Sequence, residues 1–333
     1  MAGVAFLSII LGVGIGSVCI TPVQIAAIFM NKMFHVPLPE NFNEIYIGLL
    51  LNIRLPRVLL AFLVGAALSV SGTVMQSVLK NPLASSYGLG VSSGAGLGAI
   101  LVMMCGVSSG VLGVFLLPVV GLLFGLGTVF ISIFLASKFD RNMSNFNIVL
   151  TGMVVSLFIN AIMSTLASTS QEYSQRILLW QLGSFSLKEW SYVLVLFPIV
   201  MACIVFFMRF TLELDILTFG EEQASAMGIE IKKAKWILIG MTAILTGTAV
   251  SFVGIIGFVD LIGPHVVRRF FGCEHKYVIP MSALFGGSFM VIADLLARTL
   301  VSPSEIPIGS ITALVGAPFF IYIFFRSGKE KVA

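Results

Sequence analysis

Residues 54–84 read RLPRVLLAFLVGAALSVSGTVMQSVLKNPLA. From Val58 to Leu79 this stretch carries no charged side chain, and about 20 such apolar residues are enough for a helix to cross the hydrocarbon core of a bilayer. A helix satisfies its backbone N–H and C=O groups internally, which the absence of water requires. Pro82 disfavours a helical conformation at Asn81, so we expect the helix to end just before that residue. The stretch therefore predicts a membrane-spanning helix.

The rest of the chain has the same apolar character. Of its 333 residues, 58% are hydrophobic and 10% are charged, whereas roughly 25% are charged in a soluble domain. The apolar runs are continuous rather than alternating, which favours helices over a β-barrel. The predicted fold class is an all-α integral membrane protein with about ten transmembrane helices in a single domain, residues 1–333. The expected segments are 3–30, 45–79, 91–106, 111–137, 146–167, 188–209, 234–256, 258–268, 278–300 and 307–325.

Two segments differ from ordinary spans. Residues 258–268 are too few to cross a bilayer alone, so we expect a half-helix whose partner is buried in protein. Residues 169–186 are too polar for the middle of a bilayer and predict an interfacial helix. Close helix packing is expected at two pairs of glycines spaced four residues apart, Gly94 with Gly98 and Gly121 with Gly125.

The positions of the 19 Lys and Arg residues indicate the orientation. Cytoplasmic connections are enriched in these residues, and placing both termini inside puts most of them on that side, including Lys232, Lys233 and Lys235. The longest polar connection, residues 211–235, is too short for a domain with its own core. The chain has no Walker A sequence, so ATP-driven transport would need a separate ATPase subunit.

The sequence offers little for catalysis. Its four cysteines lack the spacing of a metal or redox site, and the histidines His35, His265 and His275 are not clustered with other ligands. An ion-coupled carrier would need ionisable residues deep in its spans, where Asp260 and His265 are the main candidates. A secondary carrier and a membrane-embedded enzyme are retained as alternatives to a transport passage driven by a partner subunit.

A short helix is expected within the connection 211–235, where Gly220 and Gly228 bracket a segment with acidic residues. Ala224 and Met227 are predicted to share one face of this helix. Its acidic residues would either be solvated or meet a partner. From these residues alone, a helix that docks into a cleft on an ATPase and an ordinary surface helix are equally good interpretations.

Three of the arginines expected on the outer side, where the general bias disfavours them, are candidates for a docking surface. Arg54 and Arg57 are spaced i, i+3 and are therefore predicted to share a helical face. Arg298 follows Asp294 by four residues, a spacing that predicts an ion pair. Contact of these long side chains with lipid headgroups is the alternative to a protein docking role.

The strings that match a known family are residues 54–84, quoted above, YGLGVSSGAGLGA at 87–99, GPHVVRR at 263–269 and ADLLARTLVSPSEIPIGSITALVGAPFF at 293–320. Through them the chain resembles, over nearly its whole length, the iron-chelate, heme and vitamin B12 family of ABC-importer permeases. The resemblance implies a type II importer permease, homodimeric, in a bacterial or archaeal cytoplasmic membrane. It also implies two cytoplasmic ATPase subunits that hold ATP and Mg²⁺, and an extracytoplasmic substrate-binding protein.

The resemblance further implies that this chain is a non-catalytic transport subunit that binds no cofactor and no metal. Its substrate would be a ferric siderophore or heme, with cobalamin or another metal complex such as molybdate as the alternative. The family commonly has glycine where this chain has Asp260, which leaves the local structure at that turn open.

The resemblance assigns roles to individual residues. Docking of the binding protein would use Arg54, Arg57 and Arg298. Coupling to the ATPase, through the loop 211–233, would use Gly220, Glu221, Glu222, Ala224, Met227 and Gly228. A cytoplasmic gate would lie at Asn81 and Leu83, with a second gate in the loop 142–146 at Ser144 and Asn145. The pathway would be lined by Met153, Leu157, Asn160, Ser164, Ser310 and Leu314.

Overall fold

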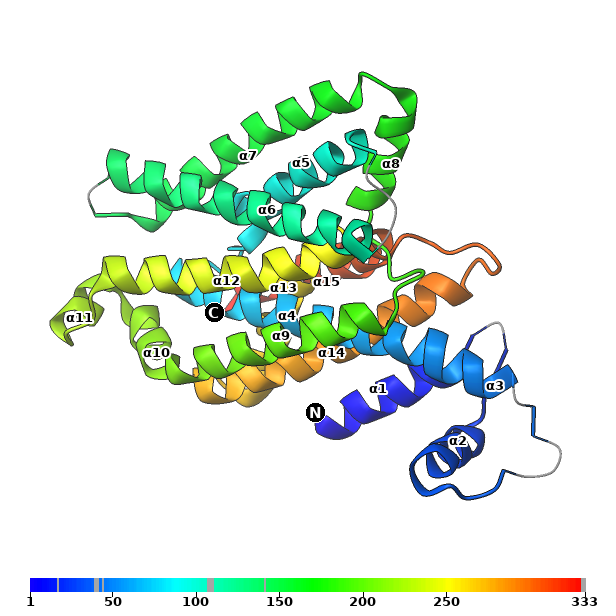
Figure 1. The fold of residues 1–333 in the computed structure, drawn as a ribbon. Coiled ribbons are helices and arrows are strands. Elements are labelled where there is room, and N and C mark those ends of the chain that lie inside the picture. Colours follow the sequence, from blue (N-terminus) through cyan, green and yellow to red (C-terminus); the bar gives the residue numbers. More distant parts are fainter. Residues whose placement is uncertain (17, 39–41, 44, 107–110, 141, 331–333) are drawn as a thin grey trace.

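The structure is a computed structural model of the chain, and it describes residues 1–333 except 17, 39–41, 44, 107–110, 141 and 331–333. The described residues form helices and connecting turns, without a strand (Figure 1). The helices are α1 (Ala2–Gly14), α2 (Pro22–Phe34), α3 (Ile45–Gly48), α4 (Leu55–Val78), α5 (Val91–Met104), α6 (Val111–Phe139), α7 (Asn145–Ala167), α8 (Gln171–Gln181), α9 (Trp190–Arg209), α10 (Thr211–Phe219), α11 (Glu221–Ala226), α12 (Ile231–Val253), α13 (Val259–Phe271), α14 (His275–Thr299) and α15 (Ile308–Glu330). A π-helical turn, η1 (Leu49–Arg54), leads into α4, and a 3₁₀ turn, η2 (Ser86–Leu89), precedes α5.

The predicted all-α class is confirmed. Among the described residues, 6 helical stretches are long and apolar enough to cross a membrane, and they contain α4, α6, α7, α9, α12 and α14. Two of the other expected spans, 91–106 and 258–268, correspond to the short helices α5, with 14 residues, and α13, with 13. The polar segment expected at 169–186 contains the separate short helix α8. The total of ten spans and the orientation with both termini inside stay predictions.

The first expected span, residues 3–30, is wrong as a single helix. α1 ends at Gly14, and α2 begins after Thr21, which caps it. The guanidinium of Arg54 donates to three carbonyl oxygens at the end of α1 and just beyond it. Carbonyls at a helix end need partners from outside the helix, and the guanidinium supplies them where the chain leaves α1.

α4 is the most deeply buried of the long helices. In the stretch that contains it, 89% of the apolar window is buried, and the helix packs against α9, α12, α13 and α14. Glycines bring α4 and α14 together: a Cβ on Gly65 would lie 2.1 Å from the carbonyl oxygen of Gly286, and a Cβ on Gly286 would lie 2.3 Å from that of Gly65. Neither position accepts a side chain without separating the two helices.

The same close approach joins α5 to α6. A Cβ on Gly94 would lie 2.9 Å from the Cα of Gly125, and a Cβ on Gly98 would lie 3.1 Å from the Cα of Gly121. The close packing predicted at these two glycine pairs is confirmed.

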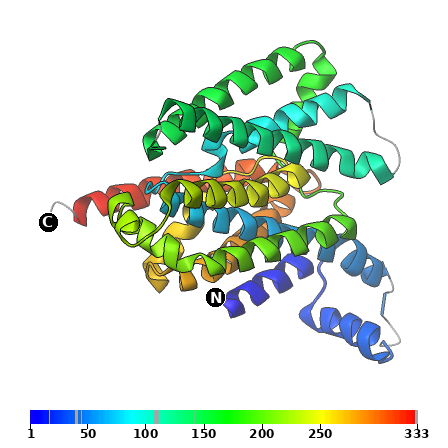
Figure 2. The ribbon, with the colours of Figure 1, turned by 60° about the vertical axis from the view of Figure 1, so that its left-hand side comes forward.

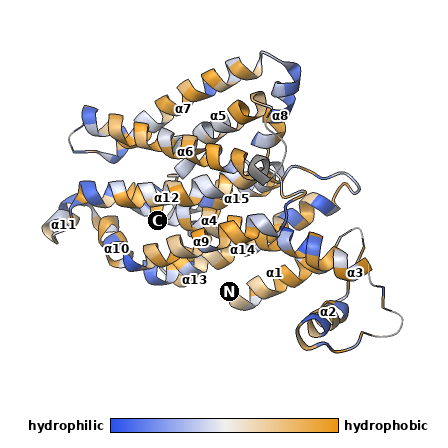
Figure 3. Ribbon diagram, viewed as in Figure 1, coloured by the Kyte–Doolittle hydropathy of each residue, from blue (hydrophilic) through white to orange (hydrophobic). Residues whose placement is uncertain are grey.

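The bundle has two polar ends. Figure 3 shows hydrophilic residues gathered at both ends, with mainly hydrophobic helices between them. One end carries α10 and α11, and the opposite end carries α8 and the loop between α14 and α15 (Figure 1). The turned view in Figure 2 shows the last turns of α15, in red, on the same side as α11. Following the orientation predicted above, we call the α11 end the cytoplasmic end and the other the outer end.

Candidate functional site

The helix expected between two glycines exists as α11, at the cytoplasmic end. Gly220 precedes it with φ of 140° and Gly228 follows with φ of 87°, both in the left-handed region that glycine adopts without strain. Ala224 is 0% exposed and Met227 is 67% exposed. The shared face predicted for these two residues is therefore wrong, because the helix ends at Ala226 and Met227 lies in the turn that follows.

One side of α11 is exposed, and the other contacts the helical bundle. Glu222, Gln223 and Met227 are exposed. Glu221, by contrast, accepts a hydrogen bond at Oε1 from Nζ of Lys235 at 2.8 Å. The exposed acidic and apolar side chains form a surface that a cleft in a partner subunit can contact.

The predicted gate at Asn81 and Leu83 is a tight turn after α4. The Oδ1 of Asn81 accepts from the backbone N–H of Leu83, and its carbonyl oxygen accepts from that of Ala84, each at 2.9 Å. Leu83 is 48% exposed. The turn therefore has a hydrogen-bonded backbone and an apolar side chain on its surface. A Cβ on Gly220 would lie 3.4 Å from Nζ of Lys80, which places the start of α11 beside this turn.

Asp140 organises the second predicted gate, the loop 142–146. Its Oδ2 accepts from the backbone N–H of Ser144 and from the amide of Asn147, each at 2.9 Å. These hydrogen bonds, led by those from Ser144, hold the pKa of the Asp140 carboxyl below its usual range. Ser144 and Asn145 are half-buried at the start of α7, so the loop is held in one defined conformation.

The predicted pathway residues are Met153, Leu157, Asn160 and Ser164 on α7 and Ser310 and Leu314 on α15. The four on α7 are all exposed, and only 22% of the apolar window of this helix is buried. Leu314 is 71% exposed, while Ser310 is half-buried. A single copy of the chain therefore leaves this uncharged set of side chains largely uncovered.

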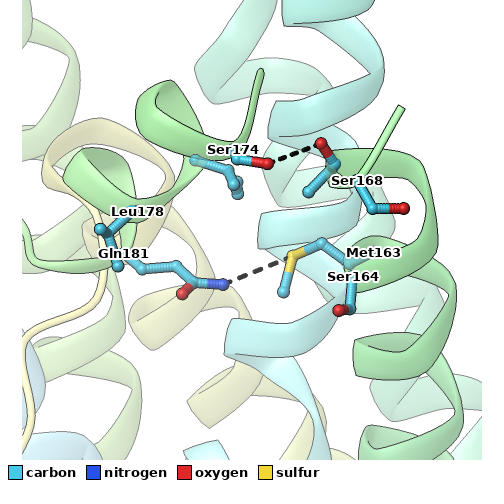
Figure 4. Close-up of a pocket in the computed structure, with 8 residues that line it drawn as sticks. Met163, Ser164, Ser168, Ser174, Leu178 and Gln181 are labelled. Atoms are coloured by element: carbon cyan, nitrogen blue, oxygen red, sulfur yellow. Dashed lines mark hydrogen bonds between the residues drawn. The ribbon is translucent and has the colours of Figure 1, made fainter. Parts of the chain in front are cut away.

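A cavity of about 350 Å³ lies where α7 meets α8 (Figure 4). Ser164 lines it together with Met163 and residues of α8. The Oγ of Ser174 donates to the carbonyl oxygen of Ala167 at 2.8 Å, and Nε2 of Gln181 lies 3.7 Å from the Sδ of Met163. The residues that line the cavity are uncharged. The uncharged face of α7 therefore extends to the outer end of the bundle.

Two of the outer arginines are held by carboxylates. Arg57 places Nη2 2.8 Å from Oδ1 of Asp294 and Nη1 2.7 Å from Oε1 of Glu305. Arg298 donates to the carbonyl oxygen of Gly12, and its Nε lies 3.7 Å from Oδ2 of Asp294. The ion pair predicted between Asp294 and Arg298 is confirmed.

Arg54 is 4% exposed, and its guanidinium reaches the end of α1. Its guanidinium donates to the carbonyl oxygens of Val13 at 3.0 Å, Gly14 at 3.1 Å and Val18. Arg54 is the last residue of the π-helical turn η1 and Arg57 lies in the first turn of α4, and the two have different partners, so the shared face stays a prediction. Docking through the arginines stays a prediction, and for Arg54 it would require these bonds to break first.

Asp260 is the second residue of α13 and is buried. Its carboxylate accepts from the hydroxyl of Ser85, just beyond the first gate turn. A Cβ on Gly72 would lie 1.8 Å from the carbonyl oxygen of Asp260, so α13 and α4 touch here. Asp260 therefore connects the gate segment to α13.

Among the described residues, no three His, Cys, Asp or Glu side chains gather to hold a metal ion.

Two buried polar residues were not predicted as site residues. Lys235, which the sequence places in a basic cluster, is 0% exposed, and His275 is 1% exposed. Helical spacing is the signal that could have identified Lys235, because Leu238 and Ile239 follow it at i+3 and i+4 and are buried on the same side. His275, at the start of α14, carries the same signal, because Val278 and Ile279 follow it at i+3 and i+4 and are also buried.

Whole-chain comparisons agree with this arrangement. A model of the FecCD transport family matches residues 4–326. The chain is 39% identical over 329 residues to the uncharacterized ABC transporter permease protein YvrB of Bacillus subtilis, which covers 98% of this chain and 93% of that protein. It is 36% identical over 283 residues to the hemin transport system permease protein HmuU of Yersinia pestis, which covers 84% of each.

The fold is similar to that of a solved metal-chelate type ABC transporter in an inward-facing conformation, with a TM-score of 0.84 and 30% identity over 98% of this chain and 97% of that one. Further relatives are named as permeases for cobalamin, molybdate and ferric dicitrate. Because these relatives are import permeases, the membrane-embedded enzyme and the ion-coupled carrier are set aside. The chain therefore belongs to the FecCD transport family and is a permease subunit of an ABC importer of the metal-chelate and vitamin class.

Proposed function

We propose that two copies of this chain form the membrane passage of an importer for an iron chelate, either a ferric siderophore or heme. The observation that carries the proposal is the uncovered face of α7, where Leu157 is 69% exposed and Asn160 and Ser164 are exposed beside it. An amide against hydrocarbon would lack hydrogen-bond partners, so lipid alone is a poor cover for this face. A second copy related by a twofold axis would cover it and enclose an uncharged passage.

The exposed tip of α11 would meet one of two cytoplasmic ATPase subunits, which bind ATP and Mg²⁺. Closure of the ATPase pair would displace α11, and the turns that carry Leu83 and Ser144 would respond by opening or closing the passage. No covalent chemistry is required of this chain. The extracytoplasmic binding protein would supply most of the affinity for the substrate.

That binding protein would dock at the outer end through Arg57 and Arg298. The side chain of Glu305 is 38% exposed, whereas that of Asp294 is 2% exposed. A carboxylate of the binding protein would therefore replace Glu305 on Arg57 while Asp294 stays in place. Arginine suits such an exchange because its planar fork can hold a carboxylate through two hydrogen bonds.

Cobalamin or molybdate is the alternative substrate, favoured by the relatives that are named for these ligands. Uptake into proteoliposomes decides between them. The chain is reconstituted with its ATPase and binding protein, and ATP-dependent uptake of a ferric siderophore, heme, cobalamin and molybdate is measured. We expect uptake of an iron chelate, and uptake confined to cobalamin or molybdate would overturn the iron assignment.

The dimer and the gate are tested by crosslinking. After the native residues Cys19, Cys105, Cys203 and Cys273 are replaced, Leu83→Cys should crosslink the two copies when the cytoplasmic gate is closed. The crosslink should be lost in the nucleotide state that opens the gate. Leu187→Cys, 98% exposed and at the outer end, serves as the control that should not respond to nucleotide. Absence of a Leu83→Cys crosslink in every nucleotide state would contradict the gate.

A further inference from the structure

Lys235, in the first turn of α12, is 0% exposed. A lysine is almost never fully buried unless its ammonium is paired, because removing the charge from water is costly. The Nζ of Lys235 donates to the carbonyl oxygen of Met143 at 2.6 Å and to Oε1 of Glu221 at 2.8 Å. The ammonium is thus shared between one charged and one neutral acceptor.

The two acceptors belong to different parts of the transport machinery. Glu221 is the first residue of α11, the helix proposed to meet the ATPase. Met143 directly precedes Ser144, in the loop of the second predicted gate. Lys235 therefore lies between the proposed input of ATP-driven motion and a proposed gate.

The Met143 side of this connection is well fixed. Met143 has a left-handed backbone with φ of 51°, which few residues other than glycine adopt, and its side chain is 2% exposed. Its N–H donates to the carbonyl oxygen of Asp140 at 3.0 Å, and the carboxylate of Asp140 in turn holds Ser144. A displacement of the Met143 carbonyl consequently displaces the whole loop rather than one residue.

The geometry points to a role for Lys235 as the positioning residue that transmits movement of α11 to the 142–146 loop. A buried ammonium separated from either acceptor would be left partly unpaired, which is strongly unfavourable. When α11 moves, Lys235 follows Glu221 and carries the Met143 carbonyl with it. The inference rests on the proposed function, since it takes α11 as the ATPase contact and the loop as a gate.

The test uses the complete reconstituted importer with Lys235→Met, which keeps a long unbranched side chain and removes the charge. Lys233→Met is the matched control, because Lys233 lies in the same helical turn and is exposed. We expect Lys235→Met to keep ATP hydrolysis while uptake falls about tenfold, within the usual range for the loss of a coupling interaction. The nucleotide-dependent distance change between spin labels at Asn145→Cys in the two copies should shrink in parallel.

Two results would overturn the inference. One is uptake by Lys235→Met equal to that by Lys233→Met. The other is a proportional loss of uptake and ATP hydrolysis with unchanged label distances, which would make Lys235 a structural brace only. If wild-type protein shows no ATP-dependent uptake, the proposed function itself fails, and the two failures are thereby distinguished.

Should Lys235→Met not assemble, Glu221→Gln decides the question. The side chain of Glu221 is 35% exposed, so the change is tolerable for folding, and the neutral amide weakens the bond to Lys235. The same separation of uptake from ATP hydrolysis is expected, with the ATPase still copurifying. Unchanged uptake in Glu221→Gln would overturn the inference. Where both variants assemble, the double variant should lose no more uptake than Lys235→Met alone, because both act on one bond.

Discussion

The two ends of α4 are held by different kinds of interaction. At the outer end the contacts are ionic: Arg57 lies between Asp294 and Glu305, and the Asp294 side chain is 2% exposed. Arg54, in the turn just before α4, adds hydrogen bonds to the end of α1. Every one of these bonds involves a guanidinium that is largely removed from water.

At the cytoplasmic end, the side chains of α4 itself are neutral. Ser77 places its Oγ 2.6 Å from Nε2 of His275, whose Nδ1 lies 2.5 Å from Oδ1 of Asp215 on α10. Arg268 donates to Oε1 of Gln76 at 2.6 Å. This end of α4 is thus connected to α10, α13 and α14 through its own hydroxyl and amide groups, while the charged partners, the Arg268 guanidinium and the Asp215 carboxylate, lie on other helices.

The difference indicates which end can move. Separating a buried ion pair costs about 3–5 kcal/mol, whereas a hydrogen bond between a neutral and a charged group contributes about 1.5–3 kcal/mol. The outer end therefore acts as a fixed point. The cytoplasmic end can change partners, and it lies next to the Leu83 turn and to α10, which leads into α11.

The largest effect is expected for Asp294→Asn, which keeps the shape of the side chain and leaves Arg57 and Arg298 without their buried counter-charge. The free energy of unfolding should fall by about 3–5 kcal/mol. Unfolding of the purified protein in detergent measures it, with Glu305→Gln as the more exposed control. A shift no larger than that of Glu305→Gln would contradict the idea of a fixed outer end.

Arg54→Met should have the next largest effect. It leaves the carbonyl oxygens at the end of α1 without donors, at a cost of about 1–3 kcal/mol. Faster hydrogen exchange in α1, with α4 unchanged, would accompany this loss. Arg176→Met is the control, since Arg176 has a side chain that is 55% exposed and pairs only within α8. Equal stability of the two variants would show that the bonds to α1 contribute nothing.

Arg54 also shows where prediction from the sequence stops. The spans around α4, α6, α7, α9, α12 and α14 were predictable because uninterrupted apolar runs have one stable arrangement in a bilayer. The break between α1 and α2 has a local signal, because Thr21 and Gln24 form a capping box with Pro22 at the start of α2, but the bonds from Arg54 to the end of α1, many residues away, have none. Spacing rules apply within one helix and give no information on a partner from another.

The predicted site residues divide in the same way. The α11 segment and the exposed face of α7 follow from local glycines and from helical spacing. Lys235 and His275 do not, because their roles depend on Met143 and Ser77, which the fold brings close from 92 and 198 residues away. Helical spacing could have indicated that both residues are buried, but it gives no information on the partners to which they bond.

His275→Ala should affect transport more than stability. It removes one hydrogen bond to Ser77 and the contact with Asp215, so the free energy of unfolding should fall by about 1–2 kcal/mol. Uptake by the reconstituted importer should fall further than ATP hydrolysis, because the hydrogen-bonded link from Ser77 through His275 to Asp215 on α10 is lost. His265→Ala is the matched control on α13, where His265 is half-buried. A large loss of stability with normal coupling of uptake to ATP hydrolysis would show that the cytoplasmic end of α4 is the fixed one, which contradicts the comparison.

The smallest effect is the pH dependence of the outer end through Glu305. Burial raises the pKa of this carboxyl, but hydrogen bonds from Arg57 and Ser186 outweigh it, so the pKa lies below the ordinary value. A carboxyl whose pKa is lower in the folded state stabilises the protein above its unfolded pKa of about 4.3, and the contribution disappears as the pH falls through the folded value. Because the side chain is 38% exposed, solvent screening keeps the contribution below about 1 kcal/mol.

Thermal unfolding of wild type and Glu305→Gln, compared between about pH 7 and pH 3, measures this contribution. Wild type should be the more stable near neutral pH, and the difference should vanish at the acid end, because the protonated carboxyl and the amide are then both neutral. A difference that stays constant over this range would mean that Glu305 contributes through packing rather than through its charge, and Arg57 would then depend on Asp294 alone.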